Sequence, residues 1–533
     1  MSDSCDIVIV GAGASGAAAA WSLSSKFDKI ICLEQGDWVD ASKYPSTNTD
    51  WEIKKSREFS PLPNHRNLPS DYQIDDKDSP IAISNFNAVG GSTILYSGHF
   101  PRLHPSDFKT YTLDKVGYDW PINYYDLEKF YSINDREMGV SGLEGDPAYP
   151  LIEGMLPPID LGEIAKVIGS GFNKLGWHWW PSYAAILTKE KDGRGRCKNL
   201  GPCNTGCPQG AKASVDITYW PKAIKNGVEL RTNSRVSRIK TNLRDEVEGV
   251  YFYDSKGKEK YLSCKMVLMA CNGIGTPRIL LNSRSHTRNE TLANRSDMVG
   301  RNLMLHPLGF IEGIFDNEMN SHIGPHGCCI LSQEFYETSK DRSFKRGFTM
   351  QVLRGPGPIE LAKSGIQRGL IPWGENHHKS FKKLHGRNVG ISIICEDLPL
   401  ESNRVTLHQE LKDSNGIPCP KINYKLCDNT KKMMAFGLQK GKEVMEASGA
   451  RSIYTFGPVR NTGWHLMGTT KMGSDRETSV VNKYGMAHDV KNLFVIDSSI
   501  FPTGGAVNPT SSIQAIALFI SENIKNGNAF NES

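Results

Sequence analysis

The order strand, glycine-rich turn, helix, strand near the N-terminus constrains this chain most. A continuous β-branched run at residues 6–10 ends in the turn at 11–16, and an alanine-rich helix is expected over 17–23. A second apolar strand is expected at 29–33, with Glu34 at its end. Such runs are typical of strands buried on both faces of a parallel sheet. The segment therefore predicts a βαβ unit in the order used to bind dinucleotides.

The glycines of this turn have the spacing that a bound pyrophosphate requires. Gly11 allows the sharp turn, Gly13 lets the backbone approach the phosphates, and Gly16 lets the helix pack onto the strand. The N–H groups at the start of the helix are free to bind the anion. Glu34 lies about 20 residues further on, where an acidic side chain accepts hydrogen bonds from the adenosine ribose hydroxyls. The candidate dinucleotide-binding residues are Gly11, Ala12, Gly13, Ser15, Gly16 and Glu34.

This fingerprint leaves two questions open. It does not separate NAD from FAD. Glycines that only shape a turn, with Glu34 as a solvated strand end, are the structural alternative.

Composition sets the class of protein. The chain has 533 residues, 38% of them hydrophobic and 23% charged, which is enough for a sizeable core and excludes disorder and fibres. Its 63 basic and 58 acidic residues leave a net charge of +5, so nucleic acid is not an implied partner. No apolar run reaches the roughly 18 residues of a spanning helix, so membrane insertion is not expected. The 12 cysteines are too sparse for a disulfide scaffold and favour reduced thiols.

The N-terminal residues bear on location. Residues 1–6 pass directly into the first strand, with no basic region and no small-residue cleavage site. We therefore expect a cytoplasmic protein with no export signal of its own, although export together with a signal-bearing partner stays open.

The distribution of strand-like segments predicts a discontinuous first domain. Sheet-like runs recur at 228–231, 236–239, 248–253 and 266–270, and a last strand and helix are expected at 492–496 and 511–524. Between about 303 and 453 the pattern changes to alternating segments typical of an antiparallel sheet. The predicted organisation is therefore a first domain over 1–302 with loop insertions at about 36–80 and 110–184, a second domain over 303–453, and a return to the first over 454–533.

Several further motifs occur in one order along the chain. They are Asn85-Phe-Asn-Ala-Val-Gly-Gly-Ser-Thr93, Gly273-Ile-Gly-Thr-Pro277, Trp464-His-Leu-Met-Gly468 and Gly504-Gly-Ala-Val-Asn-Pro509. In these motifs, and over nearly its whole length, the sequence resembles the glucose-methanol-choline (GMC) flavoprotein oxidoreductases. The resemblance implies an α/β + α+β fold: a Rossmann-like FAD-binding domain with a substrate-binding domain built on a mainly antiparallel sheet.

The resemblance also implies which residues hold FAD. The turn at Gly90, Gly91 and Ser92 would offer backbone amides to the pyrophosphate and flavin. Val236 would meet the adenine through its backbone, and Asp497 would lie near the ribityl chain and phosphates. The segment from Asn508 and Pro509 to Thr510 would lie by the flavin, with Thr510 at the pyrimidine edge.

Oxidation of an alcohol needs a base for the hydroxyl proton while hydride leaves for flavin N5. His465 is the candidate, because its side chain titrates near neutral pH. Asn508 can orient the substrate oxygen without changing the charge of the site. Pairing the two rests on the resemblance, since a lone histidine in an apolar stretch is usually structural. His99 is the next candidate for the base.

Two departures from the family pattern are informative. Some members attach FAD through a histidine just after the double glycine, whereas residues 94–96 here are Ile-Leu-Tyr, so non-covalent FAD is expected. Tyr96 and the stretch at 98–108 resemble the sugar-oxidising bacterial branch, which includes pyranose and C-glycoside oxidases, glycoside 3-oxidases and the catalytic subunit of FAD-dependent glucose dehydrogenase.

Cys197, Cys203 and Cys207 resemble the cysteine segment of those glucose dehydrogenase subunits. There, a three-iron cluster relays electrons to a cytochrome, and three thiolates would suffice for it. Lys198 stands where those relatives have an adjacent cysteine, so reduced structural thiols are the alternative, and a zinc site lacks a fourth ligand. A small accessory subunit or a cytochrome acceptor would then be a partner.

The sequence thus predicts FAD-dependent oxidation of a hydroxyl group on a sugar, sugar derivative or glycoside. Electrons would pass to oxygen or to another acceptor. The alternatives are a dehydrogenase of a non-sugar alcohol, choline-like or aliphatic, and a non-redox lyase on the same fold.

Overall fold

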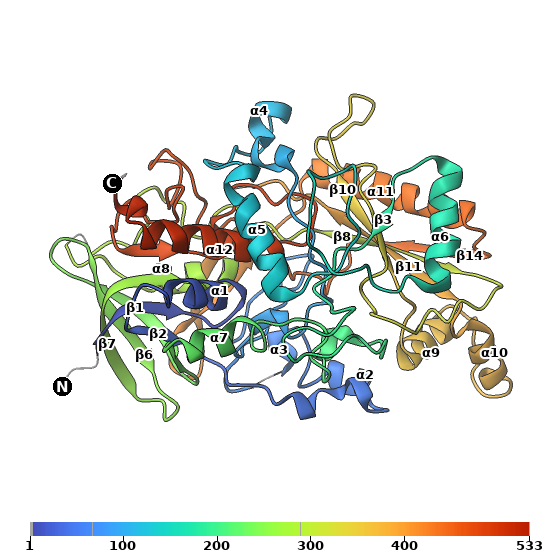
Figure 1. The fold of residues 1–533 in the computed structure, drawn as a ribbon, viewed down its shortest axis with the longest axis horizontal. Coiled ribbons are helices and arrows are strands. Elements are labelled where there is room, and N and C mark those ends of the chain that lie inside the picture. Colours follow the sequence, from blue (N-terminus) through green and yellow to red (C-terminus); the bar gives the residue numbers. More distant parts are fainter. Residues whose placement is uncertain (1–3, 67, 288, 532–533) are drawn as a thin grey trace.

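Two large β-sheets lie side by side in the computed structural model, which describes residues 4–66, 68–287 and 289–531. In Figure 1 the first sheet is on the left, near the N-terminus, and the second is on the right. No helix among the described residues is long and apolar enough to cross a bilayer. The two sheets, one partly parallel and one antiparallel, agree with the α/β + α+β fold expected from the resemblance.

The first sheet has a parallel part and an antiparallel part. Its strand order is β4-β2-β1-β7-β6-β5, with β15 also paired to β7. β1, β2, β4, β7 and β15 pair in parallel, whereas β5, β6 and β7 form an antiparallel meander. The strands are β1 (Ser4–Val10), β2 (Ile30–Leu33), β4 (Glu229–Arg231), β5 (Arg235–Thr241), β6 (Val247–Tyr253), β7 (Glu259–Met269) and β15 (Leu493–Val495).

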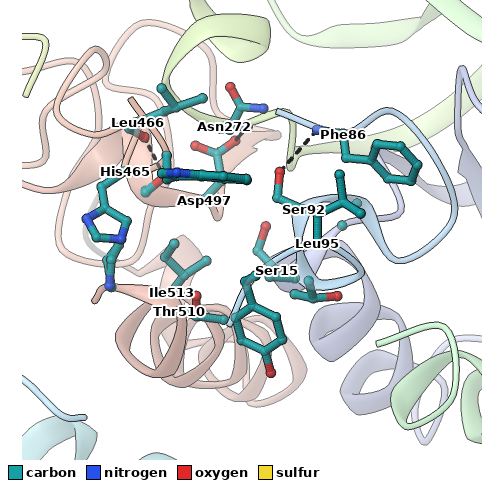
Figure 2. Close-up of a pocket in the computed structure, with 18 of the residues that line it drawn as sticks. Ser15, Phe86, Ser92, Leu95, Asn272, His465, Leu466, Asp497, Thr510 and Ile513 are labelled. Atoms are coloured by element: carbon teal, nitrogen blue, oxygen red, sulfur yellow. Dashed lines mark hydrogen bonds between the residues drawn. The ribbon is translucent and has the colours of Figure 1, made fainter. Parts of the chain in front are cut away.

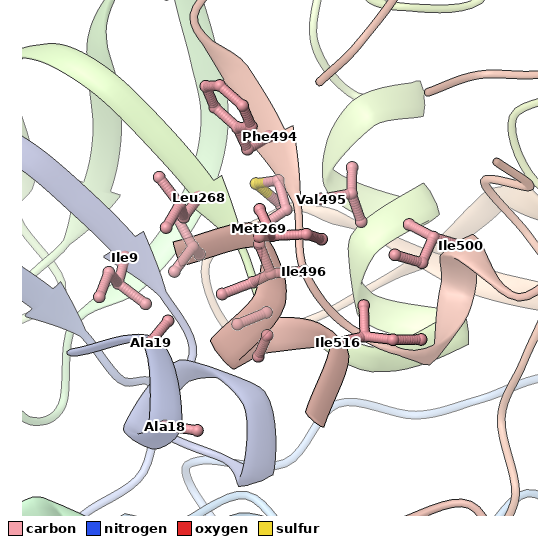
Figure 3. Close-up of a cluster of buried hydrophobic side chains, with 14 of the residues drawn as sticks. Ile9, Ala18, Ala19, Leu268, Met269, Phe494, Val495, Ile496, Ile500 and Ile516 are labelled. Carbon is pink, nitrogen blue, oxygen red and sulfur yellow. The ribbon is translucent and has the colours of Figure 1, made fainter. Parts of the chain in front are cut away.

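Helices from both ends of the chain cover this sheet. α1 (Ala14–Leu23) packs against α12 (Thr510–Lys525), which in turn packs against α5 (Tyr124–Met138). α7 (Tyr219–Lys225) packs against α1, whereas α8 (Asn272–Leu281) packs against β5. The core lies where these helices meet β1, β7 and β15, and Figure 3 shows Ile9, Leu268 and Phe494 within it. The C-terminal strand and helix thus join the first domain, as the sequence predicted.

The second sheet is antiparallel throughout. Its strand order is β14-β8-β11-β10-β9-β3. α11 (Asp428–Ala447) and α6 (Gly162–Leu175) pack on it and on one another. The strands are β3 (Trp180–Pro181), β8 (Leu308–Ile314), β9 (Ile330–Ser332), β10 (Phe348–Leu353), β11 (Asn388–Cys395) and β14 (Ser452–Phe456).

Two features differ from the sequence-based outline. α6 and β3 come from the stretch 110–184, expected as an insertion of the first domain, yet they belong to the second sheet and its core because their apolar residues pack there. The hairpin of β12 (Arg404–Lys412) and β13 (Pro418–Asn423) was expected in the antiparallel domain. It instead forms a separate sheet against α8, where Val405 and Ile422 are buried with Ile274.

The remaining elements are short or lie at the periphery. Residues 36–80, expected as a long excursion, contain single turns and two short helices in their described parts, 36–66 and 68–80. The peripheral helices are α2 (Trp51–Lys55), α3 (Pro63–Arg66), α4 (Thr110–Asp114), α9 (Pro358–Gln367) and α10 (His377–Leu384). The 3₁₀ turns are 41–43, 45–47, 91–93, 105–108, 203–205, 498–500 and 528–530.

Candidate active site

A cavity of about 400 Å³ lies at the carboxyl ends of β1 and β2 and extends to the face of the second sheet. Its size is within the range of ligand-binding cavities. Figure 2 shows Ser15 and Ser92 facing it from one side and His465 from the other, with Asp497 between them. The carboxyl edge of an open α/β sheet is where such folds bind ligands.

The glycine-rich turn divides into two groups of residues. Gly11, Gly13 and Ser15 line the cavity. A Cβ added at Gly13 would meet no atom within 4 Å, so the backbone is open to a ligand there. Ala12 and Gly16 do not line the cavity. A Cβ on Gly16 would lie 2.0 Å from the Gly11 carbonyl oxygen, so this glycine serves the close packing of α1 on β1.

Glu34 lines the same cavity and is buried. Its two oxygens accept hydrogen bonds from the N–H groups of Ala12 and Gly36, both at 2.8 Å. Burial raises the pKa of this carboxyl group, and these hydrogen bonds oppose the rise. A carboxylate has further lone pairs, so Glu34 can still accept from a ribose hydroxyl.

The double-glycine turn closes the cavity opposite α1. Gly91 and Ser92 line it, and Ser92 Oγ accepts from the Phe86 N–H at 3.2 Å. Gly90 lies outside the cavity and adopts a left-handed φ of 99°, while its N–H donates to the Ala12 carbonyl at 3.0 Å. Gly90 therefore shapes the turn, whereas Gly91 and Ser92 face the cavity.

The remaining predicted cofactor residues all line the cavity: Val236, Asp497, Asn508, Pro509 and Thr510. Asp497 is held by its surroundings, since Oδ2 accepts from Thr276 Oγ1 at 2.6 Å and from the Asn272 N–H at 3.1 Å. Burial raises its pKa, against the effect of these hydrogen bonds.

His465 and Asn508 meet at the end of the cavity that faces the second sheet. Asn508 Nδ2 lies 3.4 Å from His465 Nε2, and His306 Nδ1 lies 3.0 Å from His465 Nδ1. On the other side, Gln351 Nε2 donates to Asn508 Oδ1. Gln351, Asn508, His465 and His306 thus form one chain of contacts.

The hydrogen bonds in this series of contacts have a defined donor and acceptor at each step. An amide nitrogen only donates, so Asn508 requires a lone pair on His465 Nε2. Neutral His465 then carries its proton on Nδ1 and donates it to His306 Nδ1, because only one ring nitrogen is protonated. Gln351 fixes the Asn508 amide in the required orientation. The result is a histidine whose Nε2 is unprotonated and accepts from Asn508 at the wall of the cavity.

Burial keeps this pair of histidines neutral. The His465 pKa lies well below its ordinary value, first because of burial and then because of His306 and His99. Burial lowers the pKa of His306 to about 4, opposed by contacts with the backbone of Gly504 and Gly505. The pKa of His99, which also lines the cavity, is lowered by burial to about 4. His465 is therefore unprotonated near neutral pH, as a base must be.

The second sheet supplies a mixed wall beside this pair. Leu308, Leu353 and Ile394 contribute aliphatic surface, and Gln351 and Ser392 contribute polar groups from adjacent strands. Trp464 adds an aromatic side. This space can take a small molecule that carries both apolar groups and hydroxyl groups.

The cysteine segment gives no support to an iron cluster. Among the described residues, no group of three or more His, Cys, Asp or Glu side chains is placed to hold a metal ion. Cys197 and Cys207 accept hydrogen bonds from the N–H groups of Asn199 and Lys212, at 3.4 and 3.5 Å. Burial raises the pKa of Cys203 to about 12, which disfavours the thiolate. The described residues therefore do not support the three-iron cluster expected from the resemblance.

Comparison with known proteins identifies the family. Two family profiles, both described as GMC oxidoreductase, match residues 158–308 and 399–517. The chain therefore belongs to the GMC oxidoreductase family and is an oxidoreductase that acts on CH–OH groups. Members of this family are flavoenzymes that bind FAD.

Relatives and solved structures agree with this assignment. The 2-methyl-1,2-propanediol dehydrogenase of Mycolicibacterium austroafricanum is 38% identical, over 97% of this chain and 94% of the relative. The fructose dehydrogenase large subunit of Gluconobacter japonicus is 27% identical, over 98% of both. The structure of pyridoxine 4-oxidase from Mesorbium loti shares the fold with a TM-score of 0.65 and 18% identity, over 97% of this chain and 99% of that one.

His306 and Gln351 were not predicted from the sequence. Each is 157 or more residues from its partner in the site, so no local pattern connects them. A left-handed φ of 49° at His306 is unusual for a residue other than glycine and marks the position in the structure.

Proposed function

We propose that this protein oxidises a hydroxyl group of a small diol to a carbonyl, with His465 as the base. The observation that carries the proposal is the pair of His465 and Asn508, whose Nε2 and Nδ2 atoms lie 3.4 Å apart in the lining of the cavity. The 38% identity to a 2-methyl-1,2-propanediol dehydrogenase favours the diol. The aliphatic and polar sides of the wall suit a small branched molecule with two hydroxyl groups.

FAD fits the cavity through residues of this chain. Gly13 leaves open space for the pyrophosphate, Glu34 retains lone pairs for the ribose, and Asp497 lies on the path between them and the catalytic pair. When bound, FAD supplies the hydride acceptor. We propose that it is held non-covalently, because Ile94, Leu95 and Tyr96 include no histidine to form a link.

The protein residues would act on the substrate oxygen. A substrate hydroxyl would replace the contact between Asn508 and His465. Asn508 Nδ2 would then donate to the substrate oxygen and orient it, and His465 Nε2 would accept the hydroxyl proton as the hydride leaves carbon. His306 keeps the His465 proton on Nδ1 and stabilises the imidazolium that forms. Burial by Trp464 and the aliphatic wall keeps water away from these groups.

A sugar hydroxyl is the second candidate. Fructose dehydrogenase, a 6'''-hydroxyparomomycin C oxidase and a paromamine 6'-oxidase are similar along the whole chain, at 26–28% identity. The fructose dehydrogenase relative is named as a large subunit, which supports the proposal of an accessory subunit here. Anaerobic flavin reduction by 2-methyl-1,2-propanediol, fructose and simple alcohols would rank these candidates.

Substitution of the catalytic pair tests the assignment. We expect His465→Gln to retain bound FAD and to slow flavin reduction by roughly 10²-fold or more, as loss of a general base does. Asn508→Ala should slow reduction less, and the double variant should be far from additive because both groups act on one oxygen. Stopped-flow reduction under anaerobic conditions measures this. Wild-type rates in His465→Gln at full FAD occupancy would move the base to another residue, with His99 next.

A further inference from the structure

The connection between β10 and β11 projects from the second sheet as a pair of helices, α9 and α10, at the lower right of Figure 1. Leu361 and Leu384 anchor the pair, since both are buried with Ile314 of the sheet. Arg368 also pairs with Glu312 of β8. The projection is therefore rigidly supported at its base.

A tryptophan lies at the turn between these helices with almost all of its surface in water. Trp373 is 88% exposed, and Ile366 at the end of α9 is 39% exposed. Trp is enriched at membrane–water interfaces, where its apolar ring and polar N–H are both satisfied. Nothing in the proposed reaction uses this side chain.

The two helices and the turn between them carry more basic than acidic residues. Residues 358–387 include six lysines and arginines against two acidic residues. Arg368 and Arg387 pair with Glu312 and Glu318, which leaves the lysines as the excess charge. Lys379, Lys382 and Lys383 share one face of α10, opposite the buried Leu384. Among the described residues these three lysines have no ion-pair partner. We call Ile366, Trp373, Lys379, Lys382 and Lys383 the basic edge.

We propose that the basic edge docks the protein on an anionic lipid bilayer, with Trp373 at the level of the headgroups. An exposed aromatic ring on a projecting turn, followed by a helix with exposed lysines, suits a fluid surface that adapts to it. A protein partner would instead need a broad surface with a pocket for the aromatic anchor.

The basic edge is connected to the cavity through α2. Glu52 of α2 accepts from the N–H groups of Ile359 and Glu360 at the start of α9, at 2.7 and 2.9 Å. Burial lowers the pKa of His326, a residue that lines the cavity, to about 4, and the Lys55 charge on the same short helix as Glu52 adds to this effect. Docking would therefore bring this side of the cavity close to the bilayer.

Sedimentation of the FAD-loaded full chain with lipid vesicles tests the proposal. We expect strong partitioning to vesicles of phosphatidylcholine with one quarter phosphatidylglycerol, weak partitioning to pure phosphatidylcholine, and release at high salt. Each lysine near the surface strengthens binding roughly fivefold, so Lys379→Gln, Lys382→Gln and Lys383→Gln together should weaken it about 100-fold. Trp373→Ser should weaken binding to both kinds of vesicle.

A matched control removes the same charge elsewhere. Lys26→Gln, Lys256→Gln and Lys258→Gln lie on the exposed surface of the first domain and should leave partitioning nearly unchanged. Absence of wild-type binding to the anionic vesicles would overturn the proposal, as would equal loss in the control triple. Binding to an acidic polypeptide but not to vesicles would assign the edge to an acidic protein instead. Unchanged melting temperature and flavin content show that each variant is folded.

Discussion

At the scale of single residues, the candidate active site depends on protonation states that burial decides. His465, His306 and His99 are all buried in one region, and burial is the largest cause of the lowered pKa of each. A charged imidazolium is poorly solvated there, so the neutral form dominates. The direction of hydrogen bonding from Asn508 then determines which nitrogen of His465 holds the lone pair.

The first prediction at this scale concerns pH. Because the His465 pKa lies below its ordinary value of about 6.5, we expect flavin reduction to keep its rate as the pH falls from 8 to 6.5. The rate should fall only as the pH passes through the lowered pKa and the base becomes protonated. Anaerobic stopped-flow reduction across this range measures it, with circular dichroism to show that the fold persists. Half-loss of the rate at or above pH 6.5 would contradict the prediction.

The second concerns the flavin linkage. Ile94 and Leu95 are buried beside the double-glycine turn and have no nucleophilic atom, and Tyr96 donates its hydroxyl proton to the Ala213 carbonyl at 2.7 Å. We therefore expect acid or heat precipitation to release all yellow colour into the supernatant. Absorbance of pellet and supernatant decides the matter, and flavin retained in the washed pellet would refute non-covalent binding.

At the scale of elements, the β1–α1 unit shows two different uses of glycine. Gly16 lets the helix lie against the strand, since a Cβ there would meet the Gly11 carbonyl oxygen at 2.0 Å. Gly13 begins the helix at the cavity, where a Cβ would meet nothing within 4 Å. Packing of α1 on β1 therefore requires Gly16, and access of a ligand to the backbone requires Gly13.

This distinction predicts opposite outcomes for two alanine variants. Gly16→Ala should destabilise the fold by about 1–3 kcal/mol or more, because the added methyl group forces α1 away from β1. Gly13→Ala should keep its melting temperature as apoprotein and bind FAD at least about tenfold more weakly, because the methyl group occupies ligand space. Thermal melting and flavin titration separate the two effects. Equal melting temperatures of the two variant apoproteins would contradict the prediction for Gly16, because α1 could then move away from β1 without loss of stability.

At the scale of the whole molecule, a buried ionic cluster connects the segment before α5 to the second sheet. Arg346, which precedes β10, is 0% exposed and pairs with Asp107, with Asp114 at 3.3 Å and with Glu396 at 2.9 Å. Tyr336 donates to Asp107 Oδ2 at 2.7 Å and accepts from the Ala506 N–H at 3.0 Å. The cluster thus reaches the loop that carries Asn508.

Removal of the central charge should destabilise this connection. Arg346→Met leaves Asp107 and Glu396 buried without their cation, and loss of one partner of a buried pair typically costs about 3–5 kcal/mol. We expect a large fall in melting temperature or insoluble protein. Lys166→Ala is the control, because its pair with Glu163 is exposed and should contribute nothing measurable. A melting temperature for Arg346→Met equal to that of the control would contradict this role.

Local features of the fold could be predicted from the sequence. The β1–α1–β2 unit, the strands of the meander and the C-terminal strand and helix follow from patterns within a few residues, and the structure contains them. The place of α6 and of the β12–β13 hairpin could not be predicted. The sequence shows that each has an apolar face but not which surface that face packs against. Packing in the folded protein places α6 on the second sheet and the hairpin against α8.

The same division holds for the site. The residues by themselves indicated the glycine-rich turn and Glu34, because residue type and short spacing restrict what such groups can do. His465 and Asn508 followed from the family resemblance, and the structure brings their side chains together at the cavity. Tertiary structure decided that, in the part of the chain that the structure describes, the cysteines belong to no group placed to hold a metal ion. It also decided that Gly90 shapes the backbone and that Gln351 and His306 contact the pair. These contacts join residues 157 and 159 positions apart, and such distances close only when two sheets pack against one another.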